Sequence, residues 1–394
     1  MKVVVPNIPD LVSNLTEILE SGWLTQGKYC ESFESLGAKM AGTKYAVACT
    51  NATTGLDLVL RTMDPGIVLL PTNTHFATLL AVENAGHRPL LVDVDKYSLM
   101  MTVSSVQETY KFLDFKEVIQ VRAIIYVSIG GNLSPDILQL KSLCSTKGID
   151  LIEDCAHSHG SKVWGSPIAD ICFPHVSGGI GYAGVFSYYP TKVAFGSEGG
   201  LITTNNQRLY EQLQRLKWFG RTDHTSFEDS YSFLGLNAVM GDIQACICAH
   251  TTALLPSAIE ARKSIALRYD SVLKERHKEW EIYFPHLRDD HLPNYYKYII
   301  THHGTCDYAR DALRVRLRDE GFDLEMPVFN PPLHSQPYVV KRHRYFTSGQ
   351  EFPEADWGCK NHSCIPINPA MTSSQVDKVC QALEIWQERD LAKR

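Results

Sequence analysis

Short apolar runs alternate with helical segments from about residue 44 to residue 204. Each run is four to six residues long and almost continuously apolar, which is typical of strands buried on both faces. Such strands form mostly parallel sheets covered by helices, so the alternation predicts an α/β domain. The runs are Tyr45–Cys49, Ile67–Leu70, Pro89–Val94, Ala123–Ser128 and Ile149–Glu153.

The segment between the last two runs predicts a helix that crosses over the sheet. Ser134 is a suitable N-cap, and Gly148 is a suitable stop after Lys147. Between them, Ile137 and Leu140 share one helical face. A strand, a helix and a strand of these lengths form a right-handed parallel crossover.

The pattern changes near residue 236. A predicted helix runs from Asn237 to Pro256, and Ser257 with Glu260 forms a capping-box signal for the next helix. We therefore expect a large α/β domain over residues 1–250 and a smaller α+β domain over residues 251–394. The smaller domain is predicted to contain a strand over Tyr295–Thr301 and helices over Ala309–Glu320 and Ser373–Ala392.

Composition and charge narrow the function classes. The 394 residues carry a formal net charge of −6 without any block of Lys or Arg, which argues against nucleic acid as a partner. No apolar run approaches the ~20 residues that a membrane span needs, and the start lacks the layout of a signal peptide. We therefore expect a cytoplasmic protein without a membrane partner, and free thiols among its 11 cysteines.

One cluster, formed by Cys359, His362 and Cys364, could in principle bind a metal ion. A closed structural site needs four convergent ligands, and no second ligand pair accompanies this one. The sequence therefore predicts no metal site.

Polar residues follow the first apolar run, at the turn into the next helix. Asn51, Thr53 and Thr54 lie in this turn. Ligands of doubly wound sheets bind beyond the carboxyl ends of the strands, and a helix N-terminus binds anions through its free N–H groups. The turn is therefore a candidate phosphate site, and an ordinary polar turn is the alternative.

Asp154 ends another predicted strand, in the sequence LIEDCAHSHG, and His157 follows closely. A buried carboxylate is costly unless a cation or hydrogen-bond donors pair with it. Asp154 is therefore a candidate partner for a cationic ligand. A structural aspartate satisfied by backbone amides is the alternative.

Lys192 follows the predicted strand Phe186–Tyr189 and precedes a glycine-rich hairpin at Gly199 and Gly200. A lysine framed by aromatic residues, proline and glycine could be a desolvated amine with a lowered pKa, as a Schiff-base lysine requires. A solvated surface lysine is the alternative. A phosphate turn, a strand-end aspartate and a downstream lysine together are what pyridoxal 5'-phosphate (PLP) needs.

Motifs along nearly the whole chain resemble those of one family. They are, in order, GWLTQGKYCESFE, KYAVACTNATTGLDLVL, PTNTHFAT, LIEDCAHSHG, FSYYPTK, SEGG, LGLNAVMGDIQA, PPLHSQPY and CIPINPAMTSSQVDKV. Their order and spacing are similar to those of the DegT/DnrJ/EryC1/StrS family of PLP-dependent sugar aminotransferases. The resemblance implies the aspartate aminotransferase fold (fold type I), with a mostly parallel seven-stranded sheet in the large domain.

The resemblance also implies roles for individual residues. Lys192 would hold PLP as a Schiff base and act as the catalytic acid and base, and Asp154 would pair with the ring nitrogen. The further cofactor contacts that it implies are Thr53, Thr54 and Ser187 at the phosphate, His157 near the phenolic oxygen and His75 stacked on the ring, where the family usually has an aromatic residue.

Other positions concern the partner and the substrate. Asn237 matches an asparagine that, in this family, completes the phosphate site of the other subunit, which implies a homodimer with shared active sites. His334, in PPLHSQPY, is a candidate substrate contact, and a plain loop histidine is the alternative. The stretch Ser166–Gly181 is longer than usual and suggests a loop insertion near the site.

The resemblance implies a two-stage transamination. An amino acid, with L-glutamate as the expected donor, would pass its amine to a keto-sugar, expected to be a nucleotide-linked keto-deoxysugar. Lysine at position 192 favours transamination over the deoxygenation of family members with histidine there. Two alternatives remain: a cyclitol aminotransferase that uses glutamine, and a non-catalytic regulator, which would be expected to lose Lys192 or Asp154.

Overall fold

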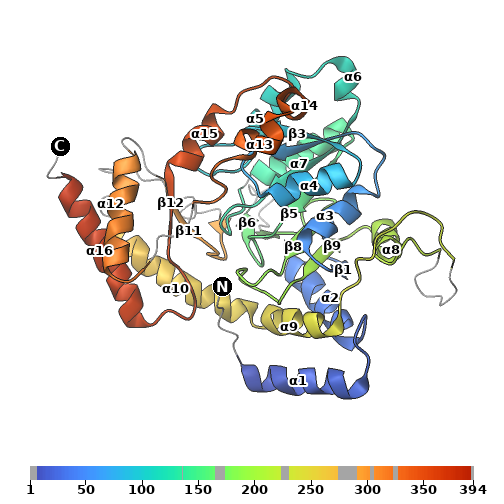
Figure 1. Cartoon of the computed structure of the whole chain (residues 1–394), viewed down its shortest axis with the longest axis horizontal. Coiled ribbons are helices and arrows are strands. Elements are labelled where there is room, and N and C mark those ends of the chain that lie inside the picture. The colour runs from blue at the N-terminus through green and yellow to red at the C-terminus, as the bar shows by residue number, and fades with distance from the viewer. Residues whose placement is uncertain are drawn as a thin grey trace, which may run out of the picture.

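A seven-stranded sheet forms the centre of the fold (Figure 1). The computed structural model describes residues 7–134, 136–164, 174–222, 230–273, 291–301, 306–322 and 327–391. The strand order is β1-β9-β8-β5-β4-β2-β3; the neighbours from β8 to β3 are parallel, and β9 is antiparallel to both β1 and β8. The strands are β1 (Tyr45–Cys49), β2 (Ile67–Pro71), β3 (Arg88–Val92), β4 (Val121–Val127), β5 (Asp150–Asp154), β8 (Ala183–Ser187) and β9 (Gly200–Thr204).

The apolar runs predicted as strands are all strands, and the predicted α/β class is confirmed. β2 is buried along its whole length, and β4 is buried except at Arg122, as expected of strands covered on both faces. The strand predicted over Phe186–Tyr189 begins earlier, at Ala183, because Gly184 pairs with Thr203 of β9.

Helices cover both faces of the sheet. Gly37 of α2 lies against the Leu201 side chain, whereas Gly55 of α3 lies against Ile202. Successive residues of β9 point to opposite faces, so α2 and α3 cover opposite faces. The helices of this part are α1 (Ile8–Ser21), α2 (Lys28–Ala41), α3 (Ala52–Leu60), α4 (Phe76–Asn84), α5 (Val103–Tyr110), α6 (Phe115–Val118), α7 (Asp136–Lys147), α8 (Gln207–Leu216) and α9 (Asp242–Ala253).

The crossover helix α7 confirms the prediction for this segment. The Ser134 hydroxyl accepts a hydrogen bond from the Asp136 N–H at 3.3 Å, which satisfies one free donor at the helix start. Gly148 follows the helix with φ +67°, a conformation that favours glycine. α7 joins β4 to β5, which are parallel neighbours.

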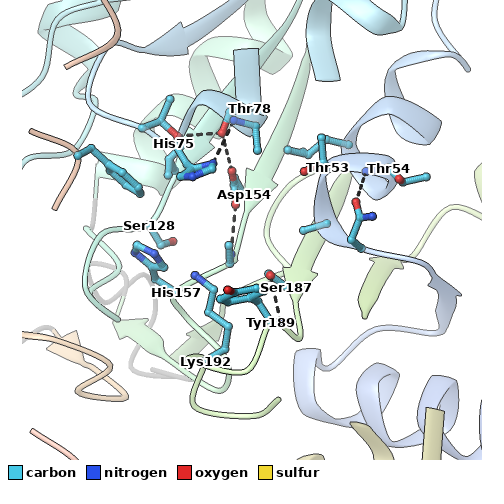
Figure 2. A pocket seen from close by; sticks show the side chains of 18 of the residues that line it. Thr53, Thr54, His75, Thr78, Ser128, Asp154, His157, Ser187, Tyr189 and Lys192 are labelled. Carbon is cyan, nitrogen blue, oxygen red and sulfur yellow. Dashed lines mark hydrogen bonds between the residues drawn. The ribbon is translucent and has the colours of Figure 1, made fainter. Parts of the chain in front are cut away.

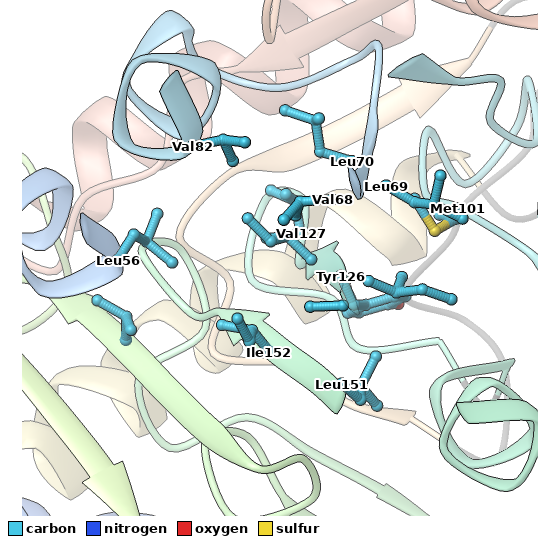
Figure 3. Packing of buried hydrophobic residues seen from close by; sticks show 14 of the residues in the cluster. Leu56, Val68, Leu69, Leu70, Val82, Met101, Tyr126, Val127, Leu151 and Ile152 are labelled. Atoms are coloured by element: carbon cyan, nitrogen blue, oxygen red, sulfur yellow. The ribbon is translucent and has the colours of Figure 1, made fainter. Parts of the chain in front are cut away.

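Most of the buried apolar side chains form one large cluster around the sheet. Figure 3 shows its centre, where Val68 and Leu70 of β2 lie near Tyr126 of β4 and Ile152 of β5. Leu56 of α3 and other helix residues close the cluster from outside. This packing holds the strands in place, and with them the edge of the sheet at which their carboxyl ends lie.

A second, smaller cluster lies in the C-terminal part of the chain. It includes Tyr269, Tyr298, Leu313 and Val379, all fully buried. Its elements are α10 (Leu255–Leu273), β11 (Tyr298–Thr301), α12 (Cys306–Asp319), β12 (His362–Ile365) and α16 (Ser373–Leu391). A three-stranded sheet joins β10 (His291–Leu292), β6 (Lys162–Trp164) and β7 (Pro174–Val176).

Residues 327–360 pack on the large cluster although they lie late in the sequence (Figure 1). The Gln350 side chain donates a hydrogen bond to the Leu91 carbonyl at 2.6 Å, and the Leu333 N–H donates to Thr72 O at 2.8 Å. The elements are η2 (Leu333–Ser335), α13 (Pro337–Val340), α14 (His343–Thr347) and α15 (Pro353–Lys360). The proposed domain boundary at residue 250 falls within α9, and this late segment returns to the large cluster.

The capping box expected at Ser257 and Glu260 is wrong. α9 ends at Ala253 and α10 begins at Leu255, so Ser257 lies inside the helix and its hydroxyl donates to the Leu254 carbonyl. Pro256 is tolerated in the first turn of the helix because backbone N–H groups there have no hydrogen-bond partner within the helix, so the N–H that proline lacks is not missed.

Candidate active site

One cavity of about 640 Å³ opens at the carboxyl ends of β4, β5 and β8 (Figure 2). Parallel strands end together at this edge, so the side chains that follow them meet there. The cavity is lined by seven of the predicted cofactor residues, which are Thr53, Thr54, His75, Asp154, His157, Ser187 and Lys192.

Asp154 is the last residue of β5, with 6% of its surface exposed. Its Oδ2 accepts a hydrogen bond from the Thr78 hydroxyl at 2.9 Å, and its Oδ1 accepts one from the Ala156 N–H at 3.2 Å. Burial raises the pKa of Asp154, and these two donors together with the Lys192 charge partly offset the shift. A buried carboxylate held in this way is suited to pair with a cationic N–H.

Lys192 lies across the cavity from Asp154, with its amine directed into the cavity (Figure 2). Its nitrogen is 5.0 Å from the centre of the Tyr296 ring, and the Tyr296 hydroxyl bonds the Thr191 hydroxyl at 3.1 Å. Burial lowers the pKa of Lys192, and Tyr296 and Asp154 partly offset this effect. A lower pKa increases the fraction of neutral amine, which is the form that attacks a carbonyl group.

The turn before α3 forms the anion-binding end of the cavity. Asn51 is the N-cap of α3, and its side-chain oxygen accepts the Thr54 N–H at 2.9 Å. Thr53 and Ser187 lie on the same side of the cavity (Figure 2). Gly200 passes directly behind the turn, where a Cβ would lie 2.4 Å from the Asn51 carbonyl carbon. The free N–H groups and hydroxyls at this end are suited to a phosphate.

His75 is the N-cap of α4, and its Nδ1 accepts the Ala77 N–H at 3.1 Å. Partial burial and the Lys192 charge lower the pKa of His75, which favours the neutral ring. A neutral imidazole fixed in the cavity wall can stack on an aromatic ligand. The stacking role of His75 remains a proposal.

His157 lies parallel to the Phe329 ring, with 5.5 Å between ring centres and 11° between ring planes. Its Nδ1 accepts the Gly130 N–H at 3.4 Å. Burial and the Lys192 charge lower the pKa of His157 well below its ordinary value. The imidazole is therefore neutral, and because Nδ1 accepts a hydrogen bond, Nε2 carries the ring hydrogen.

Two predicted residues do not line this cavity. Asn237 is exposed and forms a β-bridge with Trp218. His334 bonds Thr72 Oγ1 through Nδ1 at 2.8 Å and Asp356 Oδ1 through Nε2 at 3.1 Å. His334 thus links η2 to Thr72 after β2 through Nδ1 and to Asp356 of α15 through Nε2, and its contact with substrate stays a prediction.

The sequence reasoning does not identify several residues of the site, including Thr78, Ser128, Phe329 and Tyr296. Thr78 bonds Asp154, Ser128 and Phe329 line the cavity, and Tyr296 lies beneath Lys192. Ser128 closes an apolar run, so its position directly after β4 is the available signal, whereas Thr78 lies inside α4. Phe329 and Tyr296 come from distant segments, and only the fold brings them here.

Residues 166–173 of the predicted insertion Ser166–Gly181 lie outside the described residues. Its last part is anchored by the buried Glu153 carboxylate, which accepts the N–H groups of Gly178, Ile180 and Gly181 at 2.7–2.8 Å. This anchoring places the end of the insertion beside β5.

Within the described ranges, no group of three or more His, Cys, Asp or Glu side chains could hold a metal ion. Both ring nitrogens of His362 contact backbone groups, namely the Gly358 carbonyl and the Val328 N–H. None of the helices in the described part of the chain combines the length and apolar character needed to cross a membrane.

The fold and the site together define the class of fold type I transferases, which includes the PLP-dependent aminotransferases. The defining features are the strand order, the lysine opposite a buried aspartate and the anion site at a helix N-terminus. Comparisons with known proteins agree with this class. The family model of the DegT/DnrJ/EryC1/StrS aminotransferases matches residues 8–384, and the chain belongs to this family.

Individual relatives are similar over nearly their full length. The dTDP-3-amino-3,4,6-trideoxy-alpha-D-glucose transaminase of Micromonospora megalomicea subsp. nigra is 27% identical, covering 95% of this chain and 94% of the relative. The solved structure of the aminotransferase TlmJ from Streptoalloteichus hindustanus is 25% identical, with a TM-score of 0.81, and covers 99% of this chain and 97% of that one. For DesV of S. venezuelae, the identity is 25%, the TM-score 0.82 and the coverage 97% and 95%.

Proposed function

We propose that this aminotransferase uses PLP to move an amino group from an amino acid to a ketone on a sugar. The observation that carries the proposal is the placement of Lys192 and Asp154 across one cavity, with an anion site at its end. A non-catalytic role is disfavoured because both residues are present and line the cavity. We expect L-glutamate as the donor and a nucleotide-linked keto-deoxysugar as the acceptor.

The residues present fit PLP. The cavity offers a carboxylate for the ring nitrogen, an amine for the aldehyde and helix N–H groups for the phosphate. It also has a buried hydroxyl, that of Ser128, without a hydrogen-bond partner among the described residues. When bound, PLP supplies an electron-withdrawing ring that stabilises negative charge on the carbon next to the amine.

The protein's own groups then bind, orient and move protons. Asp154 stays ionised beside a cationic ring N–H, since a nearby positive charge favours the carboxylate form. The Lys192 amine, once free, can in its neutral form take a proton on one side of the substrate and return it elsewhere. Thr78 holds the Asp154 carboxylate in place through its 2.9 Å bond.

The sugar substrate is inferred from the relatives. The Micromonospora megalomicea relative is named for a dTDP-linked aminotrideoxyglucose, and its identity of 27% covers nearly the whole of both chains. This supports a role in amino-sugar biosynthesis.

The donor and the acceptor are tested in two separate stages. The PLP-loaded protein is incubated with L-glutamate, and release of 2-oxoglutarate is measured together with the spectral change of the cofactor. Keto-sugar nucleotides and keto-cyclitols are then screened as amine acceptors. If only glutamine converts the bound cofactor and the amine is transferred only to a cyclitol, the cyclitol alternative replaces the sugar proposal. If the cofactor is converted by none of the amino acids, the proposal is overturned.

A homodimer with shared sites is part of the proposal. Asn237 is exposed and lies away from the cavity of its own chain, and the nearby Leu234 is 86% exposed. These features suit a segment that reaches a neighbouring subunit. Asn237 would there complete the phosphate site.

Mixed dimers test this arrangement. K192A and N237A variants are each expected to be inactive or weak alone. If Asn237 serves the other subunit, a mixture contains heterodimers with one complete site, so activity reappears on mixing. If Asn237 serves its own chain, every heterodimer site lacks one residue and mixing restores nothing.

A further inference from the structure

The hydroxyl of Ser128 is buried and lacks a hydrogen-bond partner among the described residues. Ser128 directly follows β4, is 1% exposed, and donates its N–H to the Asp154 carbonyl at 3.2 Å. The backbone is therefore fixed beside Asp154. A buried hydroxyl without a partner is unfavourable, and native proteins rarely keep one without a reason.

The place of Ser128 indicates that the missing partner is a ligand. Ser128 lines the cavity, beside His157 and on the side away from Thr53 and Thr54 (Figure 2). In that view its oxygen lies on the side that faces Asp154. A molecule in the cavity would therefore meet this hydroxyl at the end opposite to the phosphate site.

His157 supplies a second donor on the same flank. Its Nδ1 accepts the Gly130 N–H and its imidazole is neutral, so Nε2 carries a hydrogen that it can donate. The parallel Phe329 ring helps to fix the plane of the imidazole. Two neutral donors on one wall favour an acceptor that carries negative charge.

The covalent structure of PLP supplies one such acceptor. The ring carbon that carries the aldehyde, with which the lysine reacts, lies between the ring carbon bearing the phosphate arm and the ring carbon bearing the phenolic oxygen. With the phosphate at the α3 end and Lys192 at the middle carbon, the phenolic oxygen lies on the opposite flank. That flank carries Ser128 and His157 (Figure 2).

We propose that Ser128 donates a hydrogen bond to the phenolic oxygen of bound PLP, as a second donor beside His157. The inference rests on the proposed function and adds to it a cofactor-binding residue. It also explains why the hydroxyl is left unpaired in the protein alone, since its partner arrives with the cofactor.

The test is an S128A variant, measured with and without PLP. Without PLP the variant loses only an unpaired hydroxyl, so its melting temperature should equal or exceed that of the wild type. With PLP the lost donor should raise Kd about tenfold. The thermal shift produced by PLP should shrink in the same variant.

An S177A variant is the matched control. Ser177 is also fully buried, but its hydroxyl bonds the Ser158 hydroxyl at 2.6 Å. Its removal should lower the melting temperature of the cofactor-free protein and leave the Kd of PLP unchanged. A residue with a merely structural role at position 128 would behave like this control.

Two probes locate the contact. Inorganic phosphate should bind wild type and S128A equally, because the phosphate site lies at the other end of the cavity. A PLP analogue that lacks the phenolic oxygen should also bind both proteins equally. If S128A weakens phosphate as much as PLP, or weakens the analogue as much as PLP, the assignment to the phenolic oxygen is wrong.

The remaining outcomes separate this inference from the proposed function. If the wild type binds PLP and S128A binds it with the same Kd, the role of Ser128 is overturned and the proposed function stands. A fall in the melting temperature of cofactor-free S128A would show that the hydroxyl has a structural role instead. Wild-type protein that binds no PLP overturns both proposals.

Discussion

Thr78 is expected to hold the Asp154 carboxylate ready for a cationic partner, and a T78V variant measures this contribution. Thr78 is 1% exposed; its hydroxyl donates to Asp154 Oδ2 at 2.9 Å and bonds the Thr74 hydroxyl at 2.8 Å. The bond to the carboxylate contributes about 1.5–3 kcal/mol, and the bond to Thr74 about 0.5–1.5 kcal/mol. Valine fills nearly the same volume, so the free energy of unfolding should fall by about 2–4.5 kcal/mol, the sum of the two bonds.

The assay is urea unfolding of the cofactor-free protein, followed by the fluorescence of its 6 tryptophans. A T78S variant keeps the hydroxyl and loses one methyl group, which should cost only about 1 kcal/mol. Thr78 stabilises the ionised form of Asp154, so the decrease in the free energy of unfolding caused by T78V should be full above the pKa of Asp154. This decrease should become smaller as the pH falls through that pKa. That pKa lies above its ordinary value of 3.8 because the group is buried.

The reasoning is refuted if T78V and T78S unfold at the same urea concentration. It is also refuted if the difference between them does not decrease on acidification. Either result would mean that the bond between Thr78 and Asp154 contributes nothing to the stability of the ionised carboxylate.

Three further predictions use separate contacts. N51A removes the N-cap of α3 and should cost about 1 kcal/mol of stability and weaken phosphate binding, both measurable by thermal shift. Burial lowers the pKa of His159 to about 3, so as the pH falls from about 6 to 3 only the unfolded state binds this proton. The free energy of unfolding should therefore fall by about 1.4 kcal/mol for each pH unit from this group alone. When that free energy is measured by urea unfolding at several pH values, its decrease with falling pH should be smaller in H159L than in the wild type. H334A should lose its bonds to Thr72 and Asp356, lowering stability by about 1–3 kcal/mol while KM for the sugar stays unchanged; a raised KM at unchanged stability would restore the substrate role.

The sequence predicts the sheet well because its signal is local. Continuous apolar runs such as Ile67–Leu70 have the length of a strand and are too short for a typical helix, and β2 is buried along its whole length. The capping box at Ser257 fails because the same residues fit the interior of a helix. Two helices separated by Leu254 alone do not produce a clear boundary signal.

The site is predicted where its residues directly follow strands. Asp154 and Lys192 come after apolar runs, so their convergence follows from the edge of a parallel sheet. Thr78 lies inside a helix, and Phe329 lies late in the sequence among residues that return to the large cluster. Their contacts depend on packing between distant segments, which no local pattern contains. Seven of the cofactor residues implied by the resemblance line the cavity, whereas Asn237 and the candidate substrate contact His334 do not.

Covalent attachment of PLP to Lys192 is the central claim, and borohydride reduction tests it most directly. The purified protein is incubated with PLP, reduced, digested and analysed by mass spectrometry, with K192A treated in parallel. The account predicts a reduced pyridoxyl group on Lys192 alone and none in K192A. A wild-type protein that remains unlabelled, or a label on another lysine that persists in K192A, would contradict it.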